Sequence, residues 1–186
     1  MKTTMHRMLV PFLLVFAALV VAPARPALAL SASELRQDAE AALAHLYKET
    51  PSAKVLGDHA KAVLIFPNIV KAGFIVGGQF GEGVLMKGGA VSGYYSSVAA
   101  SYGLQAGVQG FGYALFLMTD SAVRYLDKSD GWELGVGPSV VILDAGKAKN
   151  LSTTTLKDDV YAFIFDQRGL MAGIGVQGSK ITKISK

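Results

Sequence analysis

The sequence contains no cysteine, and it has only three histidines and one tryptophan. Without cysteine the chain can form no disulfide, use no thiolate nucleophile and carry no lipoprotein anchor at a cleavage-site cysteine. Neither His45 nor His59 belongs to a cluster at metal-ligand spacing, and no serine lies in a G-x-S-x-G elbow. We therefore expect no enzyme: the residues offer no catalytic group and no metal ligands, and they imply no cofactor.

Residues 1–29 have the composition of a secretory signal peptide. A basic start precedes an apolar stretch over residues 9–22, and Ala27-Leu28-Ala29 fits the small-x-small rule for cleavage. The apolar stretch is shorter than the roughly 20 residues of a membrane span. We therefore expect cleavage before Leu30, a single domain over 30–186 and a periplasmic or secreted protein, with an uncleaved anchor as the alternative.

Removing this segment changes the charge balance. The whole chain has 18 basic and 14 acidic residues, a net charge of +4. Lys2, Arg7 and Arg25 leave with the signal and no acid does, so 15 basic residues remain against 14 acidic ones and the net charge falls to +1. A nucleic-acid binder needs a concentrated basic face. The composition shows none, so no nucleic-acid partner is expected.

The first long apolar stretch after the signal, residues 60–86, reads AKAVLIFPNIVKAGFIVGGQFGEGVLM. It predicts a strand over Val63–Phe66, a turn at Pro67-Asn68, and two further strands divided by Gly77-Gly78 and Gly81. Because it has so few charges, we expect it to form the first layer of the core and not an exposed excursion.

Upstream of this stretch the sequence predicts two helices. Ser31 and Glu34 form a capping box, and the helix they begin ends before Pro51. This helix either lies on a membrane surface or closes one side of the core; its mixture of acids and bases favours the core role. A shorter helix over 52–60 should direct Val55 and Leu56 inward.

Later in the chain, Thr119-Asp120-Ser121 offers N-cap residues for one more helix. Trp132 follows that helix, and we expect it to anchor the core. The segment Val160–Phe165, the turn DQRG and Leu170–Ser179 predict a closing hairpin. Residues 145–155 are typical of a connection or an edge strand.

Glycine is concentrated between Gly73 and Gly178, where it forms four G-x-G pairs. The pairs are Gly81 with Gly83, Gly110 with Gly112, Gly135 with Gly137, and Gly173 with Gly175. Residues two apart in a strand share a face, so each pair leaves bare backbone. Either the sheet bends there or another element packs closely, or the bare patches line a groove for an acyl chain or a flat ligand. The G-x-G-x-x-G match from Gly173 to Gly178 is rejected as a dinucleotide motif because no helix follows it.

Together these patterns predict an α+β domain. Amino-terminal amphipathic helices should pack on a curved, mostly antiparallel, glycine-rich sheet, and closure of the sheet into a barrel is left open.

Four segments, in order along the chain, resemble the SYLF domain family. They are the K-A-G-F-x-x-G-G-x-x-G-x-G-V run from Lys71 to Val84, Gly103–Leu126, Leu134–Ala148 and Val160–Ile181. The family includes secreted bacterial proteins, fungal actin-patch proteins and lipid-binding adaptors of plants and animals. Where eukaryotic members have a tryptophan after the first run, this chain has Tyr94-Tyr95.

The resemblance implies binding of anionic phospholipid or of the envelope membrane surface, without catalysis. The lysines that would carry it are Lys54, Lys61, Lys71, Lys180 and Lys183, with Lys186 completing a basic tail. Some fungal members bind actin, but the signal peptide replaces the region they use, so actin is set aside. The alternative is a periplasmic structural or interaction module that packs on a partner or forms a homo-oligomer.

Overall fold

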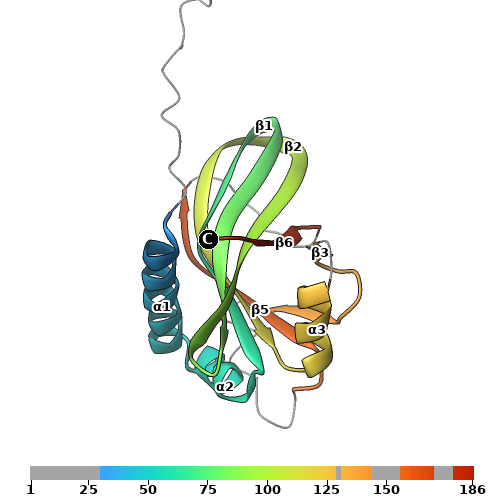
Figure 1. The fold of residues 1–186 in the computed structure, drawn as a ribbon. Coiled ribbons are helices and arrows are strands. Elements are labelled where there is room, and N and C mark those ends of the chain that lie inside the picture. The colour runs from blue at the N-terminus through green and yellow to red at the C-terminus, as the bar shows by residue number, and fades with distance from the viewer. Residues whose placement is uncertain (1–29, 129–130, 144–155, 170–177) are drawn as a thin grey trace, which may run out of the picture.

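The computed structural model describes residues 30–128, 131–143, 156–169 and 178–186, without the side chains of residues 74–75 and 101–106. The helices are α1 Ala32–Glu49, α2 Pro51–His59 and α3 Asp120–Lys128. The strands are β1 Ala62–Lys87, β2 Ala90–Leu117, β3 Trp132–Glu133, β4 Val140–Leu143, β5 Val160–Gly169 and β6 Lys180–Ile184. This is the predicted α+β domain with a curved sheet (Figure 1).

The sheet is built around the long hairpin β1–β2. Its order is β3-β6-β2-β5-β4, and β1 pairs with β2 outside this path. Every pairing is antiparallel except that of β4 with β5, which confirms the mostly antiparallel prediction. The amino-terminal part of β2 pairs with β6 and its carboxy-terminal part with β5. The sheet therefore curls into a half-barrel, and in its described part the end strands β3 and β4 do not pair.

Helices cover both faces of this sheet and give the domain two hydrophobic cores. Leu35, Leu46 and Leu56 of α1 and α2 pack in one core with Phe116 and Phe163 of the sheet. On the other face, α3 closes a core whose members include residues of β1, β2 and β6, and Trp132 beside them. Figure 1 shows α1 and α3 on opposite sides of the sheet.

The prediction of three separate strands in residues 60–86 is wrong, because β1 is one continuous strand from Ala62 to Lys87. The predicted turn at Pro67-Asn68 is a register shift between Phe66 and Ile69 in the ladder with β2. Proline has no N–H to donate to the ladder, and a bulge leaves it unpaired without ending the strand. Strand β2 continues along the other side of the ladder. Beyond the shift, Ile69 again faces the core that α3 closes.

Two glycines allow the two halves of β1 to lie against each other. A Cβ at Gly81 would lie 2.7 Å from the Asn68 carbonyl oxygen, and a Cβ at Gly83 would lie 2.6 Å from the Ile65 carbonyl oxygen. No side chain fits at these distances, so the backbones can meet only at glycine. For this G-x-G pair the structure supports close packing of another element, one of the predicted alternatives.

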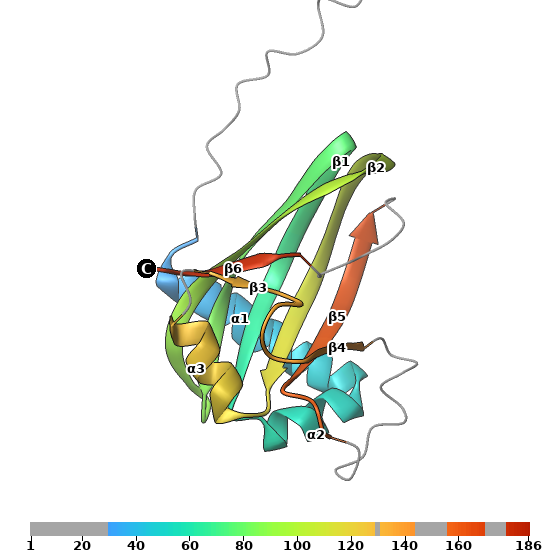
Figure 2. The same cartoon turned by 90° about the vertical axis from the view of Figure 1, so that its right-hand side faces the viewer.

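Between its two halves, β1 rises away from the helices and returns, and β2 follows it. We call residues 70–80 of β1 and 98–110 of β2 the arch. One register shift in the ladder occurs within the arch, between Phe74 and Val76. Figure 2 shows the arch standing beyond both α1 and α3.

The predicted helices form with small corrections. The capping box of Ser31 and Glu34 is present, and α1 is followed by the cap residue Thr50. In α2, Leu56 is fully buried as predicted, but Val55 is 36% exposed, because only one side of this short helix meets the sheet. None of the helices in the described ranges is long and apolar enough to cross a membrane.

The third helix also begins as predicted. The backbone N–H of Ala122 donates to the Thr119 hydroxyl at 3.2 Å, so Thr119 caps α3. Trp132 is 1% exposed and its indole N–H donates to the Val136 carbonyl at 3.0 Å, which confirms it as a core anchor.

The carboxy-terminal hairpin was predicted with a wrong boundary. The DQRG segment is not a turn but the end of β5, which continues to Gly169. Asp166 there has φ 51°, and it pairs with His45 of α1 at 3.1 Å. The strand continues because Arg168 and Gly169 still pair with β2. Most of the predicted partner strand, and all but Gly178 of the rejected glycine motif, lie outside the described residues.

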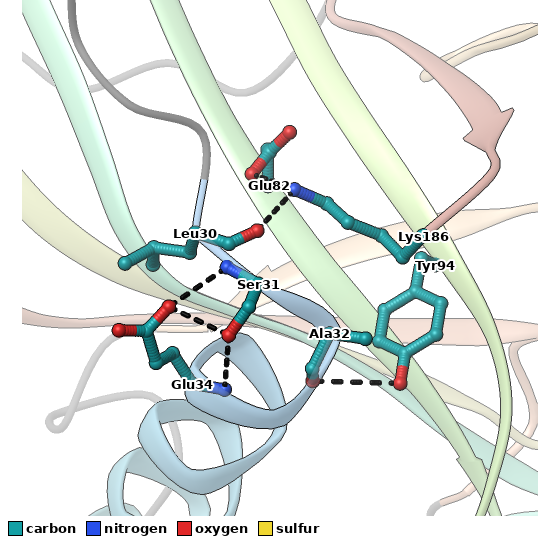
Figure 3. Close-up of polar contacts among 7 residues, drawn as sticks. All are labelled: Leu30, Ser31, Ala32, Glu34, Glu82, Tyr94 and Lys186. Atoms are coloured by element: carbon teal, nitrogen blue, oxygen red, sulfur yellow. Dashed lines mark hydrogen bonds and ion pairs between the residues drawn. The ribbon is translucent and has the colours of Figure 1, made fainter.

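The end of the chain is joined to the start of α1. The Lys186 ammonium donates to the Leu30 carbonyl oxygen at 2.7 Å and to a Glu82 carboxylate oxygen at 2.7 Å (Figure 3). The two charged side chains are only 8% and 17% exposed. This contact, the Lys186 clamp, ties both ends of the domain to the half of β1 that descends from the arch.

Candidate functional site

The arch carries most of the large apolar side chains that the described surface exposes. The five on the arch, with their exposed fractions, are Val70 (43%), Val76 (59%), Phe80 (54%), Val98 (50%) and Val108 (63%). Only single apolar residues are exposed elsewhere, as is normal for soluble proteins. A cluster of this kind marks an interaction surface.

These side chains share one face of the ribbon. Val84 belongs to the core under α1, so Phe80 and Val76, at even spacing from it, point to the same side of β1. Val70 follows Ile69, which faces the opposite core, and so it also points to the α1 side. We call this surface the arch face. The arch face belongs to the same face of the sheet as the residues under α1, but it lies beyond the part that α1 covers.

Residues paired across the ladders extend the arch face sideways. Phe80 pairs with Val98, and Val98 pairs with Lys180 of β6. In a second row, Val70 pairs with Gly110, and Gly110 pairs with Arg168 of β5. Paired residues of an antiparallel ladder share a face, so one cation lies at each side of the apolar patch.

Both cations are available to a ligand. Lys180 and Arg168 are exposed, and neither side chain forms a hydrogen bond or ion pair within the described part of the chain. Glu133 of β3 is the ladder partner of Lys180 and lies directly beside it, but among the described residues their side chains form no ion pair. The arch itself is uncharged apart from Lys71, because β1 has no charged residue between Lys71 and Glu82 and β2 has none at all.

The structure does not bring the predicted lysines together. Lys54 lies on α2, at the end of the domain away from the arch, and pairs with Asp58 at 2.8 Å. Lys61 is exposed at the start of β1 near α2. Lys71 is only 6% exposed and lies opposite Gln109, which is also buried. Only Lys180 adjoins the arch face.

The fifth predicted lysine, Lys183, contacts α3. Its ammonium lies 3.7 Å from Asp127, which also accepts a hydrogen bond from the Tyr95 hydroxyl at 3.0 Å and pairs with Lys87. Partial burial raises the pKa of Asp127, but the hydrogen bond from Tyr95 and the two lysines outweigh it, so the pKa lies below its ordinary value. Burial, followed by this hydrogen bond, raises the pKa of Tyr95. Asp127 and its partners thus hold α3 against the ribbon.

Sequence reasoning placed the apolar stretch wholly in the core, and that was wrong for the arch. The available signal was the length of the uncharged run, since β2 has 28 residues and none of them is charged. Arg168 was missed because DQRG was interpreted as a turn. Among the described residues no group of three or more histidine or acidic side chains is placed to hold a metal ion.

The fold is thus an α+β domain in which helices cover both faces of a curled sheet below an uncovered arch. Residues 98–186 match the Ysc84 family model, described as "Las17-binding protein actin regulator". This match is consistent with a SYLF domain and confirms the resemblance over the matched residues. The match begins within β2, so the run from Lys71 to Val84 lies before it. No curated protein sequence matches the chain.

Proposed function

We propose that this SYLF domain binds the surface of membranes that contain anionic phospholipid, and that it does so without catalysis. The observation that carries the proposal is the arch face, an exposed apolar patch flanked by Lys180 and Arg168. With the expected signal peptide, the membrane would be that of the bacterial envelope.

The physical argument rests on two contributions to binding. Apolar side chains that leave water for the lipid interface gain roughly 25 cal/mol per Å² of buried apolar area. Each cation near an anionic surface adds roughly 1 kcal/mol, and salt weakens this part. The arch face offers both within one surface, and its ladder already pairs many of its backbone groups.

The test is flotation of purified protein with neutral and phosphatidylglycerol-containing vesicles at low and high salt. We expect the wild type to float with anionic vesicles, with partial release at high salt. The double variant Phe80→Ser/Val98→Ser should lose binding at both salt concentrations. Its matched control is Val55→Ser, an exposed valine on α2 away from the arch, which should bind as the wild type does.

The charge contribution is tested separately. Arg168→Gln/Lys180→Gln should weaken binding about thirtyfold at low salt and little at high salt, whereas Lys54→Gln/Lys61→Gln should change it much less. A wild-type protein that remains unbound with every vesicle would contradict the proposal.

A second candidate is binding to a protein partner or to another copy of the chain through the same arch face. The family description, which names a protein-binding regulator, favours it. It predicts indifference to vesicles and a stable oligomer or complex that Phe80→Ser disrupts. Analytical ultracentrifugation at micromolar concentration separates the two candidates.

A further inference from the structure

The outer side of α3 carries a feature that membrane binding by the arch does not use. Ser121, Arg124, Tyr125 and Lys128 recur at helical spacing and line an open hollow of about 440 Å³. The opposite side of α3 is buried through Ala122, Val123 and Leu126. We call it the α3 hollow. Helix α3 lies on the side of the sheet opposite α1 (Figure 1), and the arch face belongs to the α1 side.

The two cations of the α3 hollow have no described counter-ion. Neither Arg124 nor Lys128 forms a hydrogen bond or ion pair in the part of the chain that the structure describes, although Asp120 lies one turn before Arg124. Like charges four residues apart on a helix repel. Lys128 in the last turn interacts favourably with the helix dipole, but Arg124 in the middle of α3 has no such compensation.

The acid closest to them in sequence is engaged elsewhere. Asp127, between the two cations, accepts from Tyr95 and pairs with Lys87 and Lys183 on the inner side of α3. Within the part of the chain that the structure describes, the hollow therefore has two cations that form no ion pair. A ligand with about two negative charges matches it, and a phosphomonoester carries roughly −1.5 to −2 at pH 7.

The other walls indicate what the phosphate is attached to. Thr119 donates its hydroxyl hydrogen to Asp159 at 2.9 Å, so the Ser121 hydroxyl, 2.8 Å from Thr119, must donate to it. Ser121 then offers the ligand a hydrogen-bond acceptor, which suits a hydroxyl group. The Tyr125 ring, 37% exposed, offers a flat apolar wall. The volume is in the range of small-molecule sites, roughly 300–1,000 Å³, and exceeds the needs of a bare phosphate.

From these observations we infer that the α3 hollow binds a phosphomonoester of a small hydroxylated molecule, such as a sugar phosphate. Arg124 holds two phosphate oxygens with its planar fork, and Lys128 supplies a second charge. Ser121 accepts from a ligand hydroxyl, and the carbon face of the ligand packs on Tyr125. Asp127 is a positioning residue that fixes α3 on the ribbon.

The structure supplies its own reporter for this site. Trp132 is the single tryptophan, and its ring lies 6.2 Å from the Tyr125 ring in an edge-to-face contact. The loop after it also packs on Tyr125, because a Cβ at Gly137 would lie 2.6 Å from that ring. Ligand contact with Tyr125 should therefore change the emission of Trp132.

The experiment titrates purified protein with glucose 6-phosphate and records Trp132 fluorescence and calorimetric heat. Glucose is the neutral control, inorganic phosphate the bare-anion control, and dihexanoyl phosphatidylglycerol a soluble phosphodiester headgroup. We expect saturable binding of glucose 6-phosphate, at least about tenfold tighter than that of the three other probes, since each of them lacks one element that the hollow matches.

Variants then locate the site. Arg124→Gln/Lys128→Gln should abolish the response, with an unchanged circular dichroism spectrum, and Lys48→Gln on α1 should preserve it. No response from the wild type would overturn the inference, as would equal loss in Lys48→Gln. Tighter binding of phosphatidylglycerol than of glucose 6-phosphate would also overturn it and assign the hollow to a lipid headgroup. Vesicle flotation depends on the arch face and not on the α3 hollow. If the titration shows no binding to the hollow, the proposed membrane binding therefore still stands, and if flotation fails, the inference about the hollow still stands.

Discussion

Phe116 and Phe80 lie on the same β1–β2 ribbon and face the same side of the sheet, yet one is fully buried and the other is 54% exposed. The difference is the cover. Over Phe116 lie α1 and α2, and Tyr47 of α1 approaches its ring at 6.3 Å. Phe80 lies in the arch, which stands beyond the helices (Figure 2), and no described helix covers it. Both regions have apolar side chains on this face of the ribbon, so the exposure of Phe80 follows from the absence of a described helix over the arch. An apolar surface that is left uncovered in this way is available for binding.

The sharpest way to break this comparison is to truncate both phenylalanines. Phe116→Ala should lower the free energy of unfolding by about 3–5 kcal/mol, because it opens a cavity among well-packed aromatic rings. Phe80→Ala should change it by less than about 0.5 kcal/mol and should instead weaken vesicle binding. Urea unfolding followed by circular dichroism measures the first effect and flotation the second. Equal destabilisation by the two would mean that Phe80 is covered in solution.

Two glycines of β1 allow a second comparison between the helix-covered region and the arch. Gly83→Ala should destabilise the fold by about 2 kcal/mol, because its Cβ would approach the Ile65 carbonyl oxygen to 2.6 Å and push the two halves of β1 apart. Gly78→Ala on the arch is the matched control, with its Cβ 3.5 Å from the Ala99 carbonyl oxygen. We expect it to unfold within about 0.5 kcal/mol of the wild type. If the control were as damaging as Gly83→Ala, close packing at Gly83 would not be the cause.

Local patterns predicted the helices because capping and periodicity act within a few residues. The capping box at Ser31 and the cap at Thr119 specify their helices without reference to the rest of the chain. The continuity of β1 could not be seen this way, because Pro67 is a turn signal locally and only the ladder with β2 turns it into a bulge. Similarly, DQRG becomes part of β5 through its pairing with β2.

The candidate sites were less predictable than the fold because they depend on tertiary register. Lys180 and Arg168 flank one patch only because β6 and β5 pair with opposite ends of β2. The family resemblance implies Lys71 as a lipid-binding residue alongside the other lysines, but Lys71 is buried in the folded chain. The α3 hollow had a readable signal in the spacing of Arg124 and Lys128, but whether these cations had partners could be decided only from the folded chain.

The smallest expected effect concerns the Lys186 clamp, which joins the helix-covered region to the half of β1 that descends from the arch (Figure 3). Lys186→Met should lower the free energy of unfolding by about 1–2 kcal/mol, because Glu82 and the Leu30 carbonyl lose a charged hydrogen-bond partner. The matched control is Lys183→Met, whose side chain is 54% exposed in its ion pair and should cost less than about 0.5 kcal/mol. Because the clamp lies outside the arch face, vesicle binding by folded Lys186→Met should equal that of the wild type. Lost binding at unchanged stability would show instead that the arch is held in its binding shape through Glu82, and the two regions would then act as one unit.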